Sequence, residues 1–174
     1  MASASLLPSS SSARRWKHDV FLSFRGPDTL KGITSELNRL LTKRGIETFM
    51  DDRDIEVGNA ISRTIGEAIE ESRFAIIILS PNYASSTWCL QELAKICQCM
   101  EYNNRILPLF FNVEPTHVRY QGRSFKEAFT NYENSGLYRS EKLQEWKDAL
   151  KKWPISQGGN PRTTKLIENS SKQL

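Results

Sequence analysis

The chain has 174 residues, of which 39% are hydrophobic and 25% charged, and its formal net charge is +4. This length suits one domain with tails, large enough to form a hydrophobic core without metals or disulfides. The three cysteines, Cys89, Cys97 and Cys99, fall in one predicted helix, which excludes an even disulfide framework and favours a reducing compartment. With only His18 and His117 and no metal-type spacing, we expect neither a zinc site nor a serine–histidine–aspartate triad.

The first 15 residues are rich in serine and alanine, and their composition predicts a disordered arm. The longest apolar run in the arm, Leu6-Leu7, is too short for the core of a secretory signal. No apolar stretch approaches the roughly 18 residues of a membrane span. We therefore expect a soluble intracellular protein of the cytoplasm, or of cytoplasm and nucleus, without a membrane partner.

Four short apolar runs alternate with segments of helical period. The runs predict strands over 19–24, 46–50, 74–80 and 106–111. The segments between them predict helices over 29–43, 61–72 and 88–102, the first capped by Asp28 or Thr29. The third strand is apolar on both faces, as a central parallel strand must be. Pro108 places the fourth strand at an edge or a bulge, and beyond it the pattern is helical and less regular.

This alternation predicts an open parallel sheet with helices on both faces. Ligands of such sheets bind where the strands end, which here means the loops 25–28, 51–58, 81–87 and 112–119. Gly26 stands outside any dinucleotide-binding or phosphate-loop pattern. The strand ends Phe24 and Ser80 also lack the acidic residues of a response regulator. The usual phosphoryl chemistry is therefore excluded.

The segment 85–95 reads as a helix start, with a serine or threonine among residues 85–87 as its cap. At about 100° per residue, Trp88 and Glu92 lie on the side opposite Leu90 and Leu93, and so face away from the core. The spacing leaves two interpretations open. Trp88 could be half exposed under a loop beside a solvated Glu92, or the two could line a pocket in which Trp88 stacks and Glu92 meets positive charge.

Several motifs in order resemble the Toll/interleukin-1 receptor (TIR) domain in its plant immune-receptor form. They are the runs 19–26 (D-V-F-L-S-F-R-G), 49–52 (F-M-D-D) with Gly58, 68–72 (A-I-E-E-S), 79–93 (L-S-P-N-Y-A-S-S-T-W-C-L-Q-E-L), 108–115 (P-L-F-F-N-V-E-P) and 118–119 (V-R). The resemblance covers about residues 17–150. It implies an arm over 1–15, a TIR domain over 16–152, and a divergent tail over 153–174 with room for a short fifth strand and a final helix.

The resemblance implies a flavodoxin-like α/β sheet of four to five strands and assembly through TIR–TIR contacts. Many plant members cleave NAD+ to nicotinamide and ADP-ribose-type products, some of them cyclic signals, so NAD+ is the expected substrate and no cofactor is expected. Glu92 matches the catalytic glutamate of the W-C-x-x-E-L motif. The nucleotide-contacting pattern falls on Phe24, Arg25, Gly26 and Trp88, and the glycine-containing loop on Asp51, Asp52 and Gly58. Cys89 matches a cysteine linked in some members to a nucleic-acid-dependent cyclase activity.

One carboxylate is enough for this cleavage. Nicotinamide leaves a cationic pyridinium as a neutral molecule, so only the oxocarbenium-like ribose must be stabilised. Two of these residues could instead have a purely structural role. Arg25 could form an ion pair at the end of a strand, and Cys89 could be a small buried thiol.

Two departures from the family pattern affect the expected function. After the first strand the family usually has R-G-E-D-T-R, whereas residues 25–30 of this chain read R-G-P-D-T-L. The usual serine–histidine pair of a self-association face is Ser35-Glu36. A carboxylate where an interface expects imidazole would weaken association, since two Glu36 side chains near a two-fold axis repel each other.

Three functions follow, in order of preference. The first is an NAD+ glycohydrolase of plant innate immunity, activated by self-association with identical or other TIR domains. The second is a weakly active or inactive TIR–TIR adaptor or decoy. The third, nucleic-acid binding, is supported by net charge alone.

Overall fold

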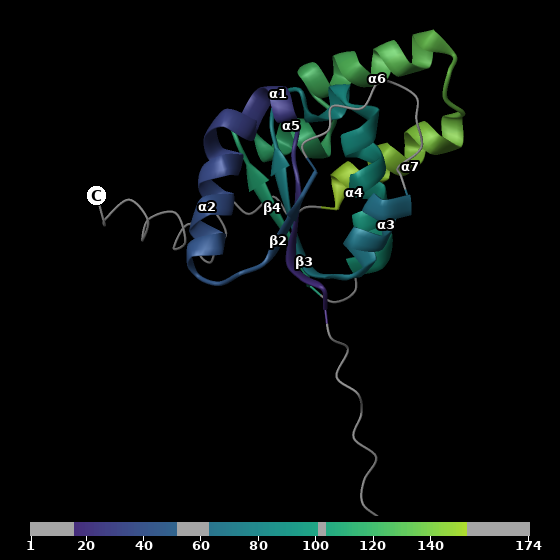
Figure 1. Ribbon diagram of the computed structural model, residues 1–174. Coiled ribbons are helices and arrows are strands. Elements are labelled where there is room, and N and C mark those ends of the chain that lie inside the picture. Colours follow the sequence, from purple (N-terminus) through teal and green to yellow (C-terminus); the bar gives the residue numbers. More distant parts are fainter. Residues whose placement is uncertain (1–15, 52–62, 101–103, 153–174) are drawn as a thin grey trace, which may run out of the picture.

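Four parallel strands form the centre of this computed structural model, which describes residues 16–51, 63–100 and 104–152 (Figure 1). In chain order they are β1 (His18–Ser23), β2 (Thr48–Met50), β3 (Ser72–Leu79) and β4 (Ile106–Phe110). Their order across the sheet is β2-β1-β3-β4, and every neighbouring pair is parallel. All four predicted strands and the parallel arrangement are confirmed.

The register of the sheet places β3 in its interior. Ile76 lies between Leu22 of β1 and Leu107 of β4, and the apolar residues of β3 are largely buried. Pro108 pairs with Ile77 on one side only, and among the described strands β4 is the outermost. This position agrees with the edge or bulge expected of a proline without an N–H, and the predicted fifth strand and final helix over 153–174 lie outside the described residues.

The chain between β1 and β2 is less regular than predicted. Instead of one helix over 29–43 it forms α1 (Gly26–Thr29), an irregular helical segment η1 (Leu30–Thr34) and α2 (Ser35–Lys43). Gly32, with φ of −130° and ψ of −113°, interrupts the helical backbone between the two ends. The prediction of a continuous helix is wrong in its first turns, because a glycine tolerates a backbone that other residues resist.

The predicted cap of this helix is also wrong. The residue before α1 is Arg25, whose side chain makes no capping hydrogen bond, and Pro27 occupies the first turn. Asp28 lies inside α1 and Thr29 donates to the carbonyl of Arg25 at 3.1 Å. Since Pro fixes the first helical turn without needing an N–H partner, the Asp28 carboxylate is available for contacts elsewhere.

The remaining helices surround the sheet on both sides, as predicted. They are α3 (Arg63–Glu70), the short turn η2 (Tyr83–Ser85), α4 (Thr87–Met100), α5 (Pro115–Arg119), α6 (Ser124–Ser135) and α7 (Ser140–Lys151). Figure 1 shows α2 on one side of the sheet and α3, α4 and α7 on the other. The helix α4 packs between the strands and α7.

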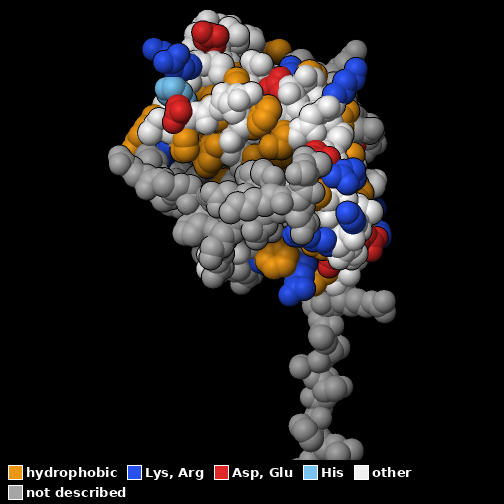
Figure 2. Space-filling model, turned by 90° about the vertical axis from the view of Figure 1, so that its left-hand side faces the viewer, with side chains coloured by type: hydrophobic (Ala, Val, Ile, Leu, Met, Phe, Trp, Pro, Cys, Tyr) orange, Lys and Arg blue, Asp and Glu red, His pale blue; other side chains and the backbone are white. Residues whose placement is uncertain are grey.

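Two apolar clusters lie on the two faces of the sheet. The larger one joins β1 and β3 to α3, α4, α6 and α7, and it contains the fully buried Trp146 and Phe125. The smaller one lies under α2 and includes many half-buried side chains, among them Leu37 and Leu109. Figure 2 shows hydrophobic side chains reaching the surface on the side of the molecule that lies left in Figure 1.

The prediction that Trp88 and Glu92 face away from the core is wrong. The two residues are only 7% and 3% exposed. The periodicity of α4 is a property of one helix, whereas Glu92 contacts Ser23 at the end of β1, and both η2 and α7 also pack against α4. The pattern of a single helix cannot show which distant segments pack against each of its sides.

Candidate functional site

Glu92 lies in α4 beside the carboxyl end of β1. Its Oε2 atom is 2.7 Å from the Oγ of Ser23, the last and fully buried residue of that strand. The predicted site residue is therefore at the edge of the sheet where ligands of open parallel sheets bind. The solvated-charge interpretation of Glu92 is excluded by its burial.

The environment of Glu92 favours its neutral form. Burial raises the pKa of its carboxyl from 4.5 to about 8, and the nearby Asp51 carboxylate adds to the rise. The hydrogen bond from Ser23 opposes the rise. This environment therefore favours the neutral carboxylic acid over the carboxylate, which the sequence did not indicate.

Tyr83 completes the surroundings of this carboxyl group. Its Oη is 2.8 Å from Ser23 Oγ and donates to the Cys89 carbonyl at 3.0 Å, and the side chain is fully buried. Neither Ser23 nor Tyr83 was predicted as a site residue. The sequence did offer one indication of Ser23, which is a hydroxyl within the apolar run 20–24. A buried hydroxyl in a strand needs a hydrogen-bond partner.

The start of α4 behaves as predicted. Ser86 precedes the helix, and its Oγ accepts a hydrogen bond from the N–H of Cys89 at 3.3 Å. The predicted cap within 85–87 is therefore confirmed. The Cys89 thiol is buried and lies 3.4 Å from the carbonyl of Phe24, which is itself 5% exposed. This geometry matches the small buried thiol more closely than a nucleophile.

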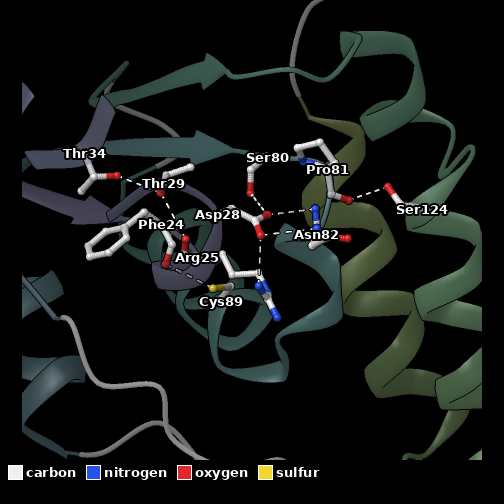
Figure 3. Close-up of polar contacts among 10 residues, drawn as sticks. All are labelled: Phe24, Arg25, Asp28, Thr29, Thr34, Ser80, Pro81, Asn82, Cys89 and Ser124. Carbon is white, nitrogen blue, oxygen red and sulfur yellow. Dashed lines mark hydrogen bonds and ion pairs between the residues drawn. The ribbon is translucent and has the colours of Figure 1, made fainter. Parts of the chain in front are cut away.

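Arg25 forms the ion pair that was one of its two alternatives. Figure 3 shows its guanidinium next to Asp28, with Nη1 at 3.1 Å from Oδ1. The guanidinium remains 25% exposed, so it still reaches the surface at the end of β1. Gly26, between this arginine and α1, is half-buried.

Asp28 links the loop after β1 to the loop after β3. Its Oδ2 accepts from Ser80 Oγ at 2.6 Å and from the Asn82 N–H at 3.1 Å, and Oδ1 accepts from Asn82 Nδ2 at 3.3 Å (Figure 3). Burial alone would raise the pKa of Asp28, but these hydrogen bonds and Arg25 hold it below its ordinary value of 3.8. This role was missed because it joins residues more than 50 positions apart.

Asp28→Ala is expected to lower the free energy of unfolding by about 2–4 kcal/mol, because it leaves the buried Ser80 hydroxyl and Arg25 without their partner. The pKa of Asp28 is lowered on folding, so its contribution is present above pH 3.8 and disappears as the pH falls through the folded value. Urea unfolding of the wild type and the variant measures the difference. Asp148→Ala removes an exposed carboxylate that accepts hydrogen bonds from Gln144 and Lys151, and it should barely shift the midpoint.

The other predicted residues are distributed differently. Asp51 follows β2 and is half-buried, while Asp52 and Gly58 lie outside the described residues. Ser35 and Glu36 are exposed at the start of α2, on the opposite side of the sheet from α4 (Figure 1). Glu36 accepts two hydrogen bonds from Arg39, at 2.9 and 2.6 Å. The structure thus gathers the predicted reactive residues and separates them from the predicted self-association pair.

A cavity of about 440 Å³ lies near the same edge of the sheet. It is lined by Pro81, Asn112, Val113, Glu114, His117, Arg123 and Ser124, and so by the loops after β3 and β4. None of the predicted substrate-binding residues lines it. Within residues 16–51, 63–100 and 104–152, no group of three or more potential ligands could hold a metal ion. In the same ranges no helix is long and apolar enough to cross a membrane.

The strand order β2-β1-β3-β4, with helices on both faces and a buried acid at the carboxyl edge, defines a flavodoxin-like α/β protein. The TIR domain family model matches residues 17–172. The chain belongs to the TIR domain family, as its motifs predicted.

Curated relatives and a solved structure place it among plant TIR domains. It is 48% identical over 145 residues to the TMV resistance protein N of Nicotiana glutinosa, covering 83% of this chain and 13% of that protein. It is 44% identical over 160 residues to the disease resistance protein RPV1 of Vitis rotundifolia, covering 88% and 11%. The TIR domains of the activated Roq1 resistosome superpose with a TM-score of 0.74 at 40% identity, over 90% of this chain and 99% of that one.

Proposed function

We propose that this chain is an immune TIR domain that cleaves NAD+ to nicotinamide and an ADP-ribose-type product, with Glu92 as its catalytic carboxylate. The observation that carries the proposal is the position of Glu92. It lies beside the end of β1, next to Trp88, within an intact W-C-x-x-E-L motif. The relatives are resistance proteins, which supports a role in plant defence.

The chemistry needs one ionised carboxylate in a desolvated place. The N-glycosidic bond breaks with its electron pair going to the nicotinamide nitrogen, which neutralises the pyridinium. The remaining positive charge on the ribose is stabilised by Glu92, more strongly in a buried site than in water. Water then adds to the ribose carbon and loses a proton, which completes hydrolysis. The guanidinium of Arg25, a quarter exposed at the same edge, is the group suited to the pyrophosphate.

Because Glu92 is buried, NAD+ can reach it only if some of the side chains around it move. Trp88 is 7% exposed and would need to turn or shift for its ring to stack on a flat ligand. Contact with another TIR domain could supply the free energy for this opening. In other enzymes, the free energy of substrate binding drives the conformational change that assembles the catalytic site. The solved Roq1 assembly contains TIR domains in an activated resistosome, which supports self-association as the trigger.

Concentration dependence tests this proposal. Purified protein at increasing concentration is incubated with NAD+, and nicotinamide and the second product are separated by chromatography. We expect release to rise more steeply than the first power of protein concentration, because the active form is an assembly. A rate strictly proportional to concentration would contradict activation by self-association.

The exposed Glu36 favours a second function, a TIR–TIR adaptor with little turnover. Its carboxylate replaces the imidazole of the family pattern and is held by Arg39 on the surface of α2. An acidic side chain at a face that meets a second copy favours a partner with a basic residue there over an identical chain.

Glu36→His is expected to strengthen self-association about five- to tenfold and to raise nicotinamide release in parallel, because it removes like-charge repulsion. Sedimentation velocity and the nicotinamide assay measure the two effects on the same sample. Glu36→Gln is the matched control, since it removes charge without adding imidazole and should give part of the gain. Unchanged association in both variants would place the contact face elsewhere.

A further inference from the structure

Three buried polar side chains and one carbonyl form a continuous chain of short contacts beside the proposed reaction centre. Glu92 Oε2 is 2.7 Å from Ser23 Oγ, which is 2.8 Å from Tyr83 Oη, which is 3.0 Å from the carbonyl oxygen of Cys89. The side chains come from α4, β1 and η2, and Ser23 and Tyr83 are fully buried. At this burial each contact should be a true hydrogen bond.

The number of hydrogens decides how these contacts can be filled. The Cys89 carbonyl can only accept, and Ser23 and Tyr83 carry one hydroxyl hydrogen each. With an ionised Glu92 there are two hydrogens for three contacts, so one pair of oxygens must face each other without a hydrogen. With a protonated Glu92 there are three. All contacts are then satisfied in one direction, from Glu92 to Ser23, to Tyr83, to the carbonyl.

We propose that Tyr83 is a positioning residue that, by accepting the hydrogen of Ser23, keeps Glu92 protonated in the substrate-free protein, so that loss of this proton precedes cleavage. The second half of this inference rests on the proposed function; the first half does not. The O–H bond of Glu92 breaks, its electron pair stays on the carboxylate, and the proton passes to water or a buffer base. A cationic pyridinium at the site would drive this step, because it stabilises the ionised form.

The titratable groups around this chain act in the same direction. The Asp51 carboxylate at the end of β2 raises the pKa of Glu92. Glu92 itself and the thiols of Cys89 and Cys97, all on α4, raise the pKa of Tyr83, which burial already lifts well above its ordinary value. Tyr83 therefore remains a hydrogen donor throughout the accessible pH range, and the proton that can leave is the one on Glu92.

Carbon-13 NMR of the glutamate side-chain carboxyl groups tests the inference without any substrate. The signal of Glu92 is assigned by its loss in Glu92→Gln and followed across the pH range. In the wild type it should titrate near 8 and not near the ordinary 4.5. Tyr83→Phe should lower its pKa by about one unit, because the Ser23 hydrogen is then free to donate to the carboxylate. Ser23→Ala should raise its pKa, because the ionised form loses that donor.

Tyr132→Phe is the matched control. Tyr132 is a second buried tyrosine whose hydroxyl donates to a main-chain carbonyl, that of Ala84 at 2.8 Å, and this hydrogen bond is separate from the chain between Glu92 and Cys89. Its replacement should leave the titration of Glu92 unchanged. Shifts of opposite sign for Tyr83→Phe and Ser23→Ala, with none for Tyr132→Phe, are not expected from a loss of packing alone.

A wild-type titration near 4.5, or equal shifts in both hydroxyl variants, would overturn the inference. Failure of the proposed function gives a different result. In that case Glu92 titrates as described and its pKa responds to both variants, but concentrated protein releases no nicotinamide from NAD+. That outcome supports the hydrogen-bond chain and overturns only its link to NAD+ cleavage.

Discussion

Glu92→Gln is expected to reduce nicotinamide release from NAD+ by about 10²–10³-fold, because the amide cannot carry the negative charge that stabilises the ribosyl cation. Its effect on folding should be small. Glutamine has nearly the same shape, and its side-chain amide can either accept a hydrogen bond from Ser23, as Glu92 does, or donate one to it. Thermal unfolding of the two proteins, beside the nicotinamide assay, separates lost chemistry from lost structure.

Glu133→Gln is the control for this change, since Glu133 is an exposed acid whose partner is Lys147 on α7. It should leave both the rate and the unfolding temperature near the wild-type values. Cleavage that survives Glu92→Gln would show that another group stabilises the cation, and the assignment of Glu92 would then be wrong.

Trp88→Ala is expected to lower the free energy of unfolding by about 3–5 kcal/mol, the usual range for removing a buried aromatic ring. Trp88 is 7% exposed and belongs to the larger apolar cluster, so its loss leaves a cavity between α4 and its neighbours. Chemical denaturation measures the change. A decrease in the free energy of unfolding of less than about 1 kcal/mol would mean that the ring contributes little to core packing.

Trp88→Phe distinguishes packing from substrate stacking. A phenyl ring fills much of the cavity, so this variant should regain most of the stability. It offers a smaller face to a flat ligand. Recovery of stability without recovery of nicotinamide release would support a role for the indole in the reaction.

Most of the fold could be predicted because its determinants are local. The four strands are short apolar runs between helical segments, and the central position of β3 follows from a run that is apolar on both faces. Pro108 indicated an outer or bulged strand, because proline has no N–H to donate to a neighbouring strand. Ser86 located the start of α4 by the bond that its side chain accepts. Each of these depends on residues within a few positions.

The errors concern contacts between distant segments. Asp28 was expected to cap a helix, but it accepts hydrogen bonds from Ser80 and Asn82 instead. Glu92 was expected to face outward, but it contacts Ser23 at the end of β1, 69 positions earlier in the chain. The periodicity of a helix shows that two sides differ, and it does not show whether the second side meets solvent or another part of the protein.

The same limit applies to the site. The position of Glu92 near the carboxyl edge of the sheet was predicted, whereas its pKa also depends on Ser23 of β1 and on Asp51 after β2, which are distant in the sequence. The interpretation of Trp88 and Glu92 as lining a pocket assumed that the Glu92 carboxylate is already ionised. The structure instead shows a buried acid whose pKa is raised by burial, next to the buried hydroxyl groups of Ser23 and Tyr83.

The pH dependence of nicotinamide release by the concentrated wild-type protein is the most direct test of Glu92 as the reactive carboxylate. Because the ionised form is required and burial raises the pKa of this group to about 8, the rate should increase with pH and level off above that value. A midpoint near 8 that shifts down in Tyr83→Phe would identify the titrating group as Glu92. A folded, self-associated protein that releases no nicotinamide at any pH would contradict the enzymatic function and leave the adaptor.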